Sequence, residues 1–227
     1  MRVLGVDLGT QTVKAVVCDV ALAVRGRGAA AYPTHYPAPD RAEQDPHDWA
    51  AQLAPAIAEA LAAAGVGADA IAAIAVTGQL DGCVAVDAGG APVAPALIWQ
   101  DRRAIDDAGC VPAAALFAAT GQVADPGHLA AKARWLRRAH PAAARFHTPV
   151  SYLVERLTGA AVIDPALAST TMLVELGAAD WSPRLCAAFA IEPETLPLVR
   201  PAAAIAGALT AAGAAATGLR AGTPVDR

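Results

Sequence analysis

Five residues near the start of the chain have the types and spacing of a phosphate-binding turn: Asp7, Gly9, Thr10, Thr12 and Lys14. Gly9 permits a positive φ angle or the close approach of a ligand to the backbone. Successive amide groups in such a turn form an anion-binding concavity. The two threonines add hydroxyl donors and Lys14 adds a positive charge. This pattern predicts contact with a phosphate group.

The carboxylate of Asp7 does not fit a site for bare phosphate, because the two negative groups repel each other. A divalent cation between them resolves the conflict, since Mg²⁺ is usually held by carboxylates, waters and substrate phosphates. The segment therefore predicts a metal–nucleotide site. The alternative is an ordinary edge hairpin whose turn happens to be polar.

The elements on either side of this turn have the pattern of an α/β protein. Short β-branched runs at residues 3–6 and 13–18 predict a hairpin, and residues 21–31 predict a third strand with a turn at residues 25–28. Asp45 and Pro46 open a predicted helix over residues 46–64. Residues 71–76 predict a buried strand. Strands interspersed with helices indicate the α/β class.

Polar loops also follow two later apolar segments, at residues 77–82 and 100–103. Ligands of open α/β sheets bind beyond the carboxyl ends of strands. Gln79 and Asp81 suit hydroxyl recognition, Trp99 suits stacking on a sugar face, and Asp101 suits a further hydroxyl. The alternatives are a turn role for Asp81, a core position for Trp99 and a helix N-cap role for Asp101.

The rest of the chain continues the mixture of strands and helices. Residues 83–86 and 96–99 predict a pair of strands, and residues 162–169 predict an extended segment. Helices are predicted over residues 112–120, 127–139, 150–157 and 183–189. The basic residues 134–138 predict a solvated helix face.

Composition excludes several classes of protein. The 227 residues are 56% hydrophobic and 17% charged, which excludes disorder. A net charge of −4 without a run of Lys or Arg argues against nucleic-acid binding. Glycines break the apolar tract at residues 201–219, which argues against a membrane span. Four isolated cysteines argue against a zinc site, and with no visible leader peptide they predict a cytoplasmic protein.

Taken in order, several motifs make the chain resemble the FGGY family of carbohydrate kinases, most closely its xylulokinase branch. The resemblance runs from Arg2 almost to Val225. Its motifs are residues 5–14, Glu43-Gln-Asp-Pro46 with Trp49, Thr77-Gly-Gln79, Pro95 to Arg103, Lys132 to Leu136, Tyr152 to Gly159, Asp164 to Ser169, and Gly222-Thr-Pro-Val225. Each motif alone is weak evidence, but their shared order is specific.

The resemblance implies an actin-like, ribonuclease-H-like domain, a mixed sheet flanked by helices, over residues 1–227. It also implies an ATP-dependent kinase that phosphorylates a sugar or polyol hydroxyl, with ATP and Mg²⁺ bound between two domains. By position, Asp7 corresponds to the metal-linked carboxylate. The phosphate loop corresponds to Gly9, Thr10, Gln11, Thr12 and Lys14, and the sugar pocket to Gln79, Leu80, Asp81, Trp99 and Asp101.

Two residue pairs differ from the patterns of the related kinases, and both differences bear on the expected substrate. Leu80-Asp81 stands where xylulokinases commonly carry Met-His, so D-xylulose is not implied directly. Gly127-His128 stands where glycerol kinases carry an aromatic pair, which favours a sugar or polyol larger than glycerol.

The family's catalytic aspartate follows a Gly-rich loop that lies beyond Arg227, and Asp226 is expected to be a tail residue instead. We therefore expect only the N-terminal half of a kinase, inactive alone, with a C-terminal domain or a second copy as partner. The alternative is a non-catalytic sugar-binding or dimerising fragment, or the remnant of a truncated kinase gene. An ATPase of the chaperone type is disfavoured by the sugar-kinase motifs at residues 43–46 and 99–102.

Overall fold

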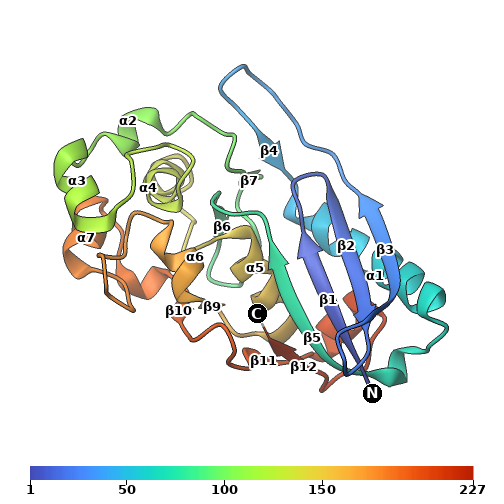
Figure 1. Cartoon of the computed structure of the whole chain (residues 1–227). Helices are drawn as coiled ribbons and strands as arrows, with labels where there is room; N and C mark the ends of the chain where they lie inside the picture. Colours follow the sequence, from blue (N-terminus) through green and yellow to red (C-terminus); the bar gives the residue numbers. More distant parts are fainter. Residues whose placement is uncertain (227) are drawn as a thin grey trace.

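The computed structural model describes residues 1–226, and a mixed six-stranded sheet lies at its centre (Figure 1). The strand order is β11-β12-β5-β1-β2-β3. Strands β1, β2 and β3 form an antiparallel meander, and β5 pairs parallel with both β1 and β12. The bounds are β1 Arg2–Leu8, β2 Thr12–Cys18, β3 Val24–Ala31, β5 Ile71–Gly78, β11 Gly207–Ala208 and β12 Pro224–Asp226. The predicted hairpin and the α/β class are confirmed.

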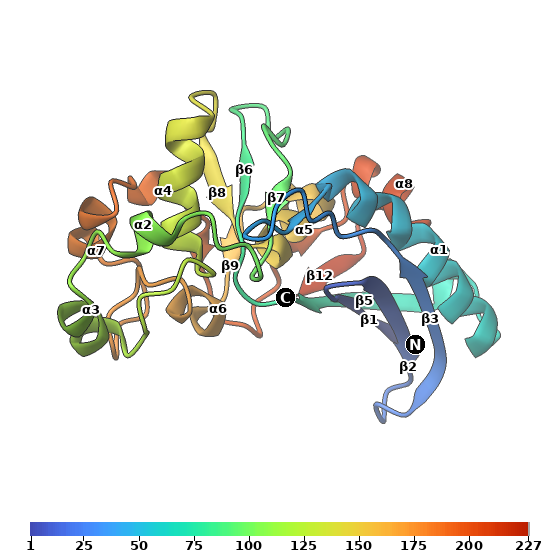
Figure 2. The ribbon, with the colours of Figure 1, turned by 90° about the horizontal axis from the view of Figure 1, so that it is seen from above.

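One face of this sheet is covered by helix α1 (Pro46–Ala64), with α5 (Pro149–Thr158) and α8 (Ala211–Thr217) beside it (Figure 2). The Asp45 side chain caps α1 by accepting a hydrogen bond from the amide of His47, as the sequence predicted. Trp49, Leu53 and Ile57 are fully buried on the face that packs against the sheet. None of the helices in residues 1–226 has the length and apolarity of a membrane-spanning segment.

The predicted turn at residues 25–28 is wrong, because these residues lie inside strand β3. The chain reverses earlier, where the Asp19 carboxylate accepts hydrogen bonds from the amides of Ala21 and Ala23. Gly26 and Gly28 are required for the close packing of α1 on β3 and not for a chain reversal. A Cβ atom on Gly28 would lie 2.1 Å from the Ala56 carbonyl oxygen, so α1 rests directly on the strand backbone.

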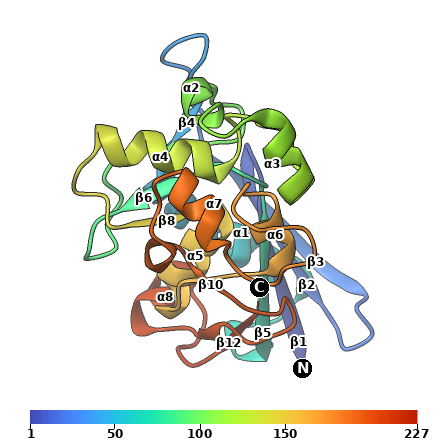
Figure 3. The same cartoon turned by 90° about the vertical axis from the view of Figure 1, so that its left-hand side faces the viewer.

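A second lobe of short helices lies at the side of the sheet and has its own apolar core (Figure 3). Its helices are α2 Ile105–Ala108, α3 Ala113–Thr120, α4 Leu129–Ala139 and α7 Pro183–Ala188. Helix α6 (Pro165–Ser169) lies next to this lobe but buries Leu167 and Ala168 in the core around the sheet. The expected extended segment over residues 162–169 is wrong beyond Ile163. Asp164 accepts a hydrogen bond from the Leu167 amide and so starts α6.

Three small two-stranded sheets complete the fold. They pair β4 (Glu43–Gln44) with β7 (Ala96–Leu97), β6 (Val84–Val86) with β8 (Arg145–His147), and β9 (Val162–Ile163) with β10 (Leu198–Val199). The expected pairing of residues 83–86 with 96–99 is reduced to one bridge, between Cys83 and Leu97. Each of these strands finds its main partner elsewhere in the chain, which local sequence patterns do not reveal.

The basic stretch on α4 forms ion pairs with other parts of the chain. Arg134 and Arg138 both pair with the buried carboxylate of Asp107, and Arg137 pairs with Glu192. These ion pairs attach α4 to α2 and to the segment after α7. The side chains of Arg134, Arg137 and Arg138 keep 32%, 39% and 57% of their surface exposed, so the face is solvated as predicted. The ion pairs were not predicted, because the partner carboxylates come from distant parts of the sequence.

Candidate functional site

The turn between β1 and β2 places Asp7 and Lys14 opposite each other as a cross-strand pair. The Lys14 Nζ atom lies 3.3 Å from Asp7 Oδ2, and both side chains are substantially exposed. The Gly9 amide donates to the Thr12 carbonyl at 3.0 Å and closes the turn. A Cβ atom on Gly9 would lie 3.7 Å from Lys14 Nζ and 3.8 Å from Asp7 Oδ2, so glycine keeps this space open. The two charged groups therefore border a cradle that a side chain would fill.

The backbone of this turn is held from below by polar side chains. The Tyr32 hydroxyl donates to the Gly9 carbonyl, and burial raises the pKa of that hydroxyl. Gln44 donates to the Thr10 carbonyl at 2.6 Å and accepts from Trp49 and from Gln79. Gln44 was part of a predicted motif but was assigned no role. Its complete burial marks it as the residue that joins the first and second loops.

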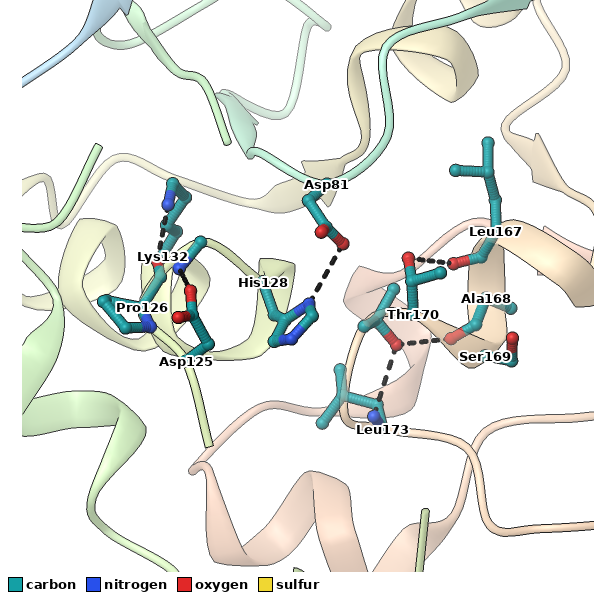
Figure 4. Close-up of polar contacts among 12 residues, drawn as sticks. Asp81, Asp125, Pro126, His128, Lys132, Leu167, Ala168, Ser169, Thr170 and Leu173 are labelled. Carbon is teal, nitrogen blue, oxygen red and sulfur yellow. Dashed lines mark hydrogen bonds and ion pairs between the residues drawn. The ribbon is translucent and has the colours of Figure 1, made fainter. Parts of the chain in front are cut away.

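The second predicted loop, residues 77–82, starts inside β5, which extends to Gly78, and its part beyond the strand carries three of the predicted sugar-binding residues. Gln79 is buried, and its Oε1 atom has no hydrogen-bond partner. Leu80 is 57% exposed. Asp81 adopts φ +57°, a left-handed conformation that is uncommon for a residue other than glycine. Figure 4 shows its carboxylate in contact with the His128 ring. The distance from Asp81 Oδ1 to His128 Nδ1 is 3.1 Å.

The third loop brings Trp99 to the first loop and leaves Asp101 inside the protein. Trp99 is 47% exposed, so it is not a core residue, and its indole N–H donates to Thr10 Oγ1 at 3.2 Å. Asp101 has no exposed surface. Its carboxylate accepts from the Ala42 amide at 2.8 Å and pairs with Arg103 at 2.8 Å. It therefore occupies neither a helix N-cap nor an open surface.

A hollow of about 760 Å³ lies across the uncovered face of the sheet and connects the first two loops. Its lining includes Asp7 and Lys14 from the hairpin, Leu80 from the second loop, and Leu167 and Thr170 from and beside α6. Of the predicted site residues, Asp7 and Lys14 from the hairpin and Leu80 from the second loop line this hollow, whereas Gln79, Asp81, Trp99 and Asp101 are not part of its lining. Gln11 is exposed at the tip of the hairpin and Thr12 is half-buried beside it.

The described residues contain no group of three or more His, Cys, Asp and Glu side chains able to hold a metal ion. Asp7 alone is the carboxylate of the cradle that faces Lys14. A single carboxylate fits Mg²⁺, which keeps several waters and binds substrate phosphates when it is held by proteins.

Comparisons with known proteins find carbohydrate kinases. A glycerol kinase from Cereibacter sphaeroides is 34% identical over 91% of this chain, and one from Thermococcus kodakarensis is 33% identical over 90%. The chain spans 45% and 44% of the length of these relatives. A crystal structure of xylulose kinase from Rhodospirillum rubrum superposes with a TM-score of 0.90 and 30% identity, over 100% of this chain and 49% of that one.

The mixed sheet with its flanking helices is the actin-like ATPase fold of carbohydrate kinases. The chain matches the FGGY family of carbohydrate kinases, N-terminal domain, over residues 2–226. It therefore belongs to the FGGY family, and the family resemblance predicted from the motifs is confirmed.

Proposed function

We propose that this chain supplies the sugar pocket and one wall of the phosphate site of an ATP-dependent carbohydrate kinase. The observation that carries the proposal is the Asp7–Lys14 pair across Gly9, at the edge of the hollow that Leu80 also borders. Phosphoryl transfer depends on positioning and on stabilising the charge of the transferred group. A cationic and metal-binding wall beside a sugar pocket meets both needs.

In this proposal Asp7 holds the Mg²⁺ ion, which neutralises charge on the phosphates of ATP when it is bound. Lys14 and the amides at the tip of the turn orient the phosphate groups, and Gly9, whose amide closes the turn, leaves room for them. The exposed Gln11 forms the tip of the same loop.

Each predicted sugar-binding residue of the second and third loops is proposed to make a different kind of contact. Gln79 offers its unpaired carbonyl oxygen, Asp81 offers a carboxylate, and Trp99 offers its exposed indole face. Leu80 supplies apolar contact. For Asp101 we propose a supporting role, because its burial places the carboxylate behind the loop that carries Trp99.

The substrate we propose is a sugar or polyol larger than glycerol, such as a pentulose. The Asp81–His128 pair favours this choice, because it presents two polar groups within reach of adjacent hydroxyls. The similar curated proteins described above are named glycerol kinases, and the structure that is 30% identical is a xylulose kinase, so both substrate classes belong in any test.

The first test is turnover by the purified chain. We expect no sugar-dependent release of ADP above a blank without sugar, because the chain spans less than half the length of its relatives and supplies one wall of the site. A coupled ADP assay over pentuloses, hexuloses, glycerol and other polyols measures this. A full-length glycerol kinase serves as positive control. Clear sugar-dependent turnover by the chain alone would contradict the proposal that transfer needs a second wall.

A binding measurement with the same sugars and polyols distinguishes a kinase domain from a remnant that no longer binds sugar. Calorimetry is expected to show weak binding of at least one sugar, which Trp99→Ala reduces about tenfold because stacking on an aromatic face contributes roughly 1–1.5 kcal/mol. Val123→Ala, at an exposed residue outside the proposed site, is the matched control. Binding without any response to Trp99→Ala would place the pocket elsewhere.

A further prediction concerns association of the isolated chain. The hollow over the sheet is lined mainly by apolar residues, and Leu80 at its border is 57% exposed. Exposed apolar surface of this kind marks interaction sites. We expect a concentration-dependent increase in molecular mass by light scattering, with Leu80→Asp shifting the chain toward monomer. A monodisperse monomer at high concentration would contradict it.

A further inference from the structure

Lys132 is a fully buried lysine on α4. Among the described residues it forms no ion pair with a carboxylate. Its Nζ atom donates instead to two backbone carbonyls, those of Asp101 at 2.8 Å and of Pro126. Figure 4 shows the contact with Pro126 next to the Asp81–His128 pair. A buried ammonium group is costly to desolvate, so a lysine at this position calls for a specific role.

The two carbonyls belong to the two segments that carry Trp99 and His128. The Asp101 carbonyl lies in the third loop, and the Pro126 carbonyl lies in the turn over residues 125–128 that leads into α4. At the surface the same two segments are joined by the ion pair between Arg102 and Asp125, with contacts of 2.6 and 2.7 Å. Lys132 therefore joins, inside the protein, the same two segments that the Arg102–Asp125 ion pair joins at the surface. We call the two hydrogen bonds from Lys132 Nζ to the carbonyls of Asp101 and Pro126 the Lys132 clasp.

The turn at residues 125–128 also contacts the second loop. The Gly82 amide donates to the Gly127 carbonyl at 3.2 Å, and a Cβ atom on Gly127 would lie 3.0 Å from the Trp99 carbonyl oxygen. A shift of this turn would therefore move His128 relative to both Asp81 and Trp99.

We propose that Lys132 is a positioning residue, which fixes the Trp99 and His128 segments relative to each other by donating to one carbonyl of each. The assignment of these segments to a sugar pocket rests on the proposed function, but the clasp itself does not. Lys132 lies in α4 between Ala131 and Ala133, which belong to the core of the lobe, and its ammonium group supplies donors that no apolar residue can supply.

The charged and titratable groups around Lys132 are Asp81, Cys83, Asp101 and Asp125, with His128 on the adjoining turn. Burial lowers the pKa of Lys132 to about 8, because desolvation outweighs the attraction of these acidic groups. The ammonium therefore loses its proton at a lower pH than an exposed lysine, which gives the clasp a measurable signature.

The decisive variant is Lys132→Met, which keeps the stem and removes the donors. Arg137→Met, on the same helix but paired with Glu192, is the matched control. We expect hydrogen exchange at the amides of Gly82, Arg102 and His128 to accelerate about tenfold in Lys132→Met, corresponding to one lost bond to a charged donor. Exchange in β1 and β5 is expected to stay unchanged, as in Arg137→Met. Uniform acceleration across the chain, or none at these three amides, would overturn the proposal.

If Lys132→Met does not fold, titration of the unaltered chain decides the question. The peptide nitrogens of Arg102 and Gly127 adjoin the two carbonyls, so their NMR shifts are expected to change together with a midpoint near pH 8, matching the Lys132 side chain. His128→Gln removes the nearby histidine as an alternative source of the transition. Titration of the Lys132 side chain without a response at both nitrogens contradicts the clasp.

A final arm separates this inference from the proposed function. If the unaltered chain binds a sugar, Lys132→Met is expected to weaken that binding at least tenfold while Arg137→Met does not. Equal sugar binding in Lys132→Met would overturn the positioning role. If no sugar binds to the unaltered chain, the proposed sugar pocket fails, and the exchange measurements still decide whether the clasp exists.

Discussion

Replacing Gly28 with valine is expected to leave the chain unfolded or close to it. Gly28 lies in β3 directly beneath α1, where a Cβ atom would lie 2.1 Å from the Ala56 carbonyl oxygen and 2.7 Å from the Ala60 nitrogen. Both contacts are with helix backbone, which cannot rotate away as a side chain can. Separating α1 from β3 would also open the core around Trp49 and Leu53.

The expected cost of Gly28→Val is more than about 4 kcal/mol, in the range reserved for severe overpacking or backbone strain. Typical domains are stable by roughly 5–15 kcal/mol, so little stability would remain. Gly67→Ala is the matched control, since a Cβ atom there meets nothing within 4 Å and its φ is −88°. That change is expected to stay within about 1 kcal/mol. Urea unfolding followed by circular dichroism measures both variants, and a Gly28→Val midpoint near that of the unaltered chain would refute the packing argument.

Replacing Asp101 with alanine is expected to destabilise the fold by about 3–5 kcal/mol, the usual result of removing one partner from a buried ion pair. Asp101 has no exposed surface and Arg103 is almost as buried, with a side chain 6% exposed. Burial works to lower the pKa of Arg103, but its contacts with Asp101 and Glu43 raise the pKa overall. Without Asp101 the guanidinium keeps Glu43 alone, and the Ala42 amide loses its acceptor.

Asp81→Asn is the matched control for Asp101→Ala, because asparagine tolerates the left-handed conformation of Asp81. Asp81 is partly exposed, so the expected change in unfolding free energy is within about 1 kcal/mol. Sugar binding is expected to be weaker in Asp81→Asn, although that variant stays folded. A stable Asp101→Ala variant that has lost only sugar binding would show that Asp101 contacts the ligand, as the motif alone suggested.

The contrast between Asp101 and Trp99 shows the limit of reasoning from motifs. Both residues follow the same apolar segment two positions apart, and the sequence suggested a sugar contact for each. The structure exposes Trp99 and buries Asp101 behind it. The difference arises because Ala42 and Arg103 provide partners for the Asp101 carboxylate, and Ala42 is 59 residues away in the chain.

Local physical chemistry was sufficient for the elements closest to the site. The β1–β2 hairpin, the start of α1 at Asp45 and the end of α5 at Gly159 depend on hydrophobic period, capping and a left-handed glycine, all of which are short-range. The phosphate-binding pattern of residues 7–14 is equally local, because a two-stranded turn places Asp7 opposite Lys14 without help from the rest of the chain.

Only the tertiary structure decided which polar residues meet. Gln44 joins Thr10 to Gln79, His128 meets Asp81, and Lys132 binds two carbonyls from different loops. Each contact joins residues brought together by the packing of the sheet and the second lobe, apart from the short step from Lys132 to Pro126. The sequence by itself thus determined the fold class, the family and the pairing of one hairpin. The arrangement of the remaining loops depended on long-range packing, since no local pattern records which distant side chain will fill a given space.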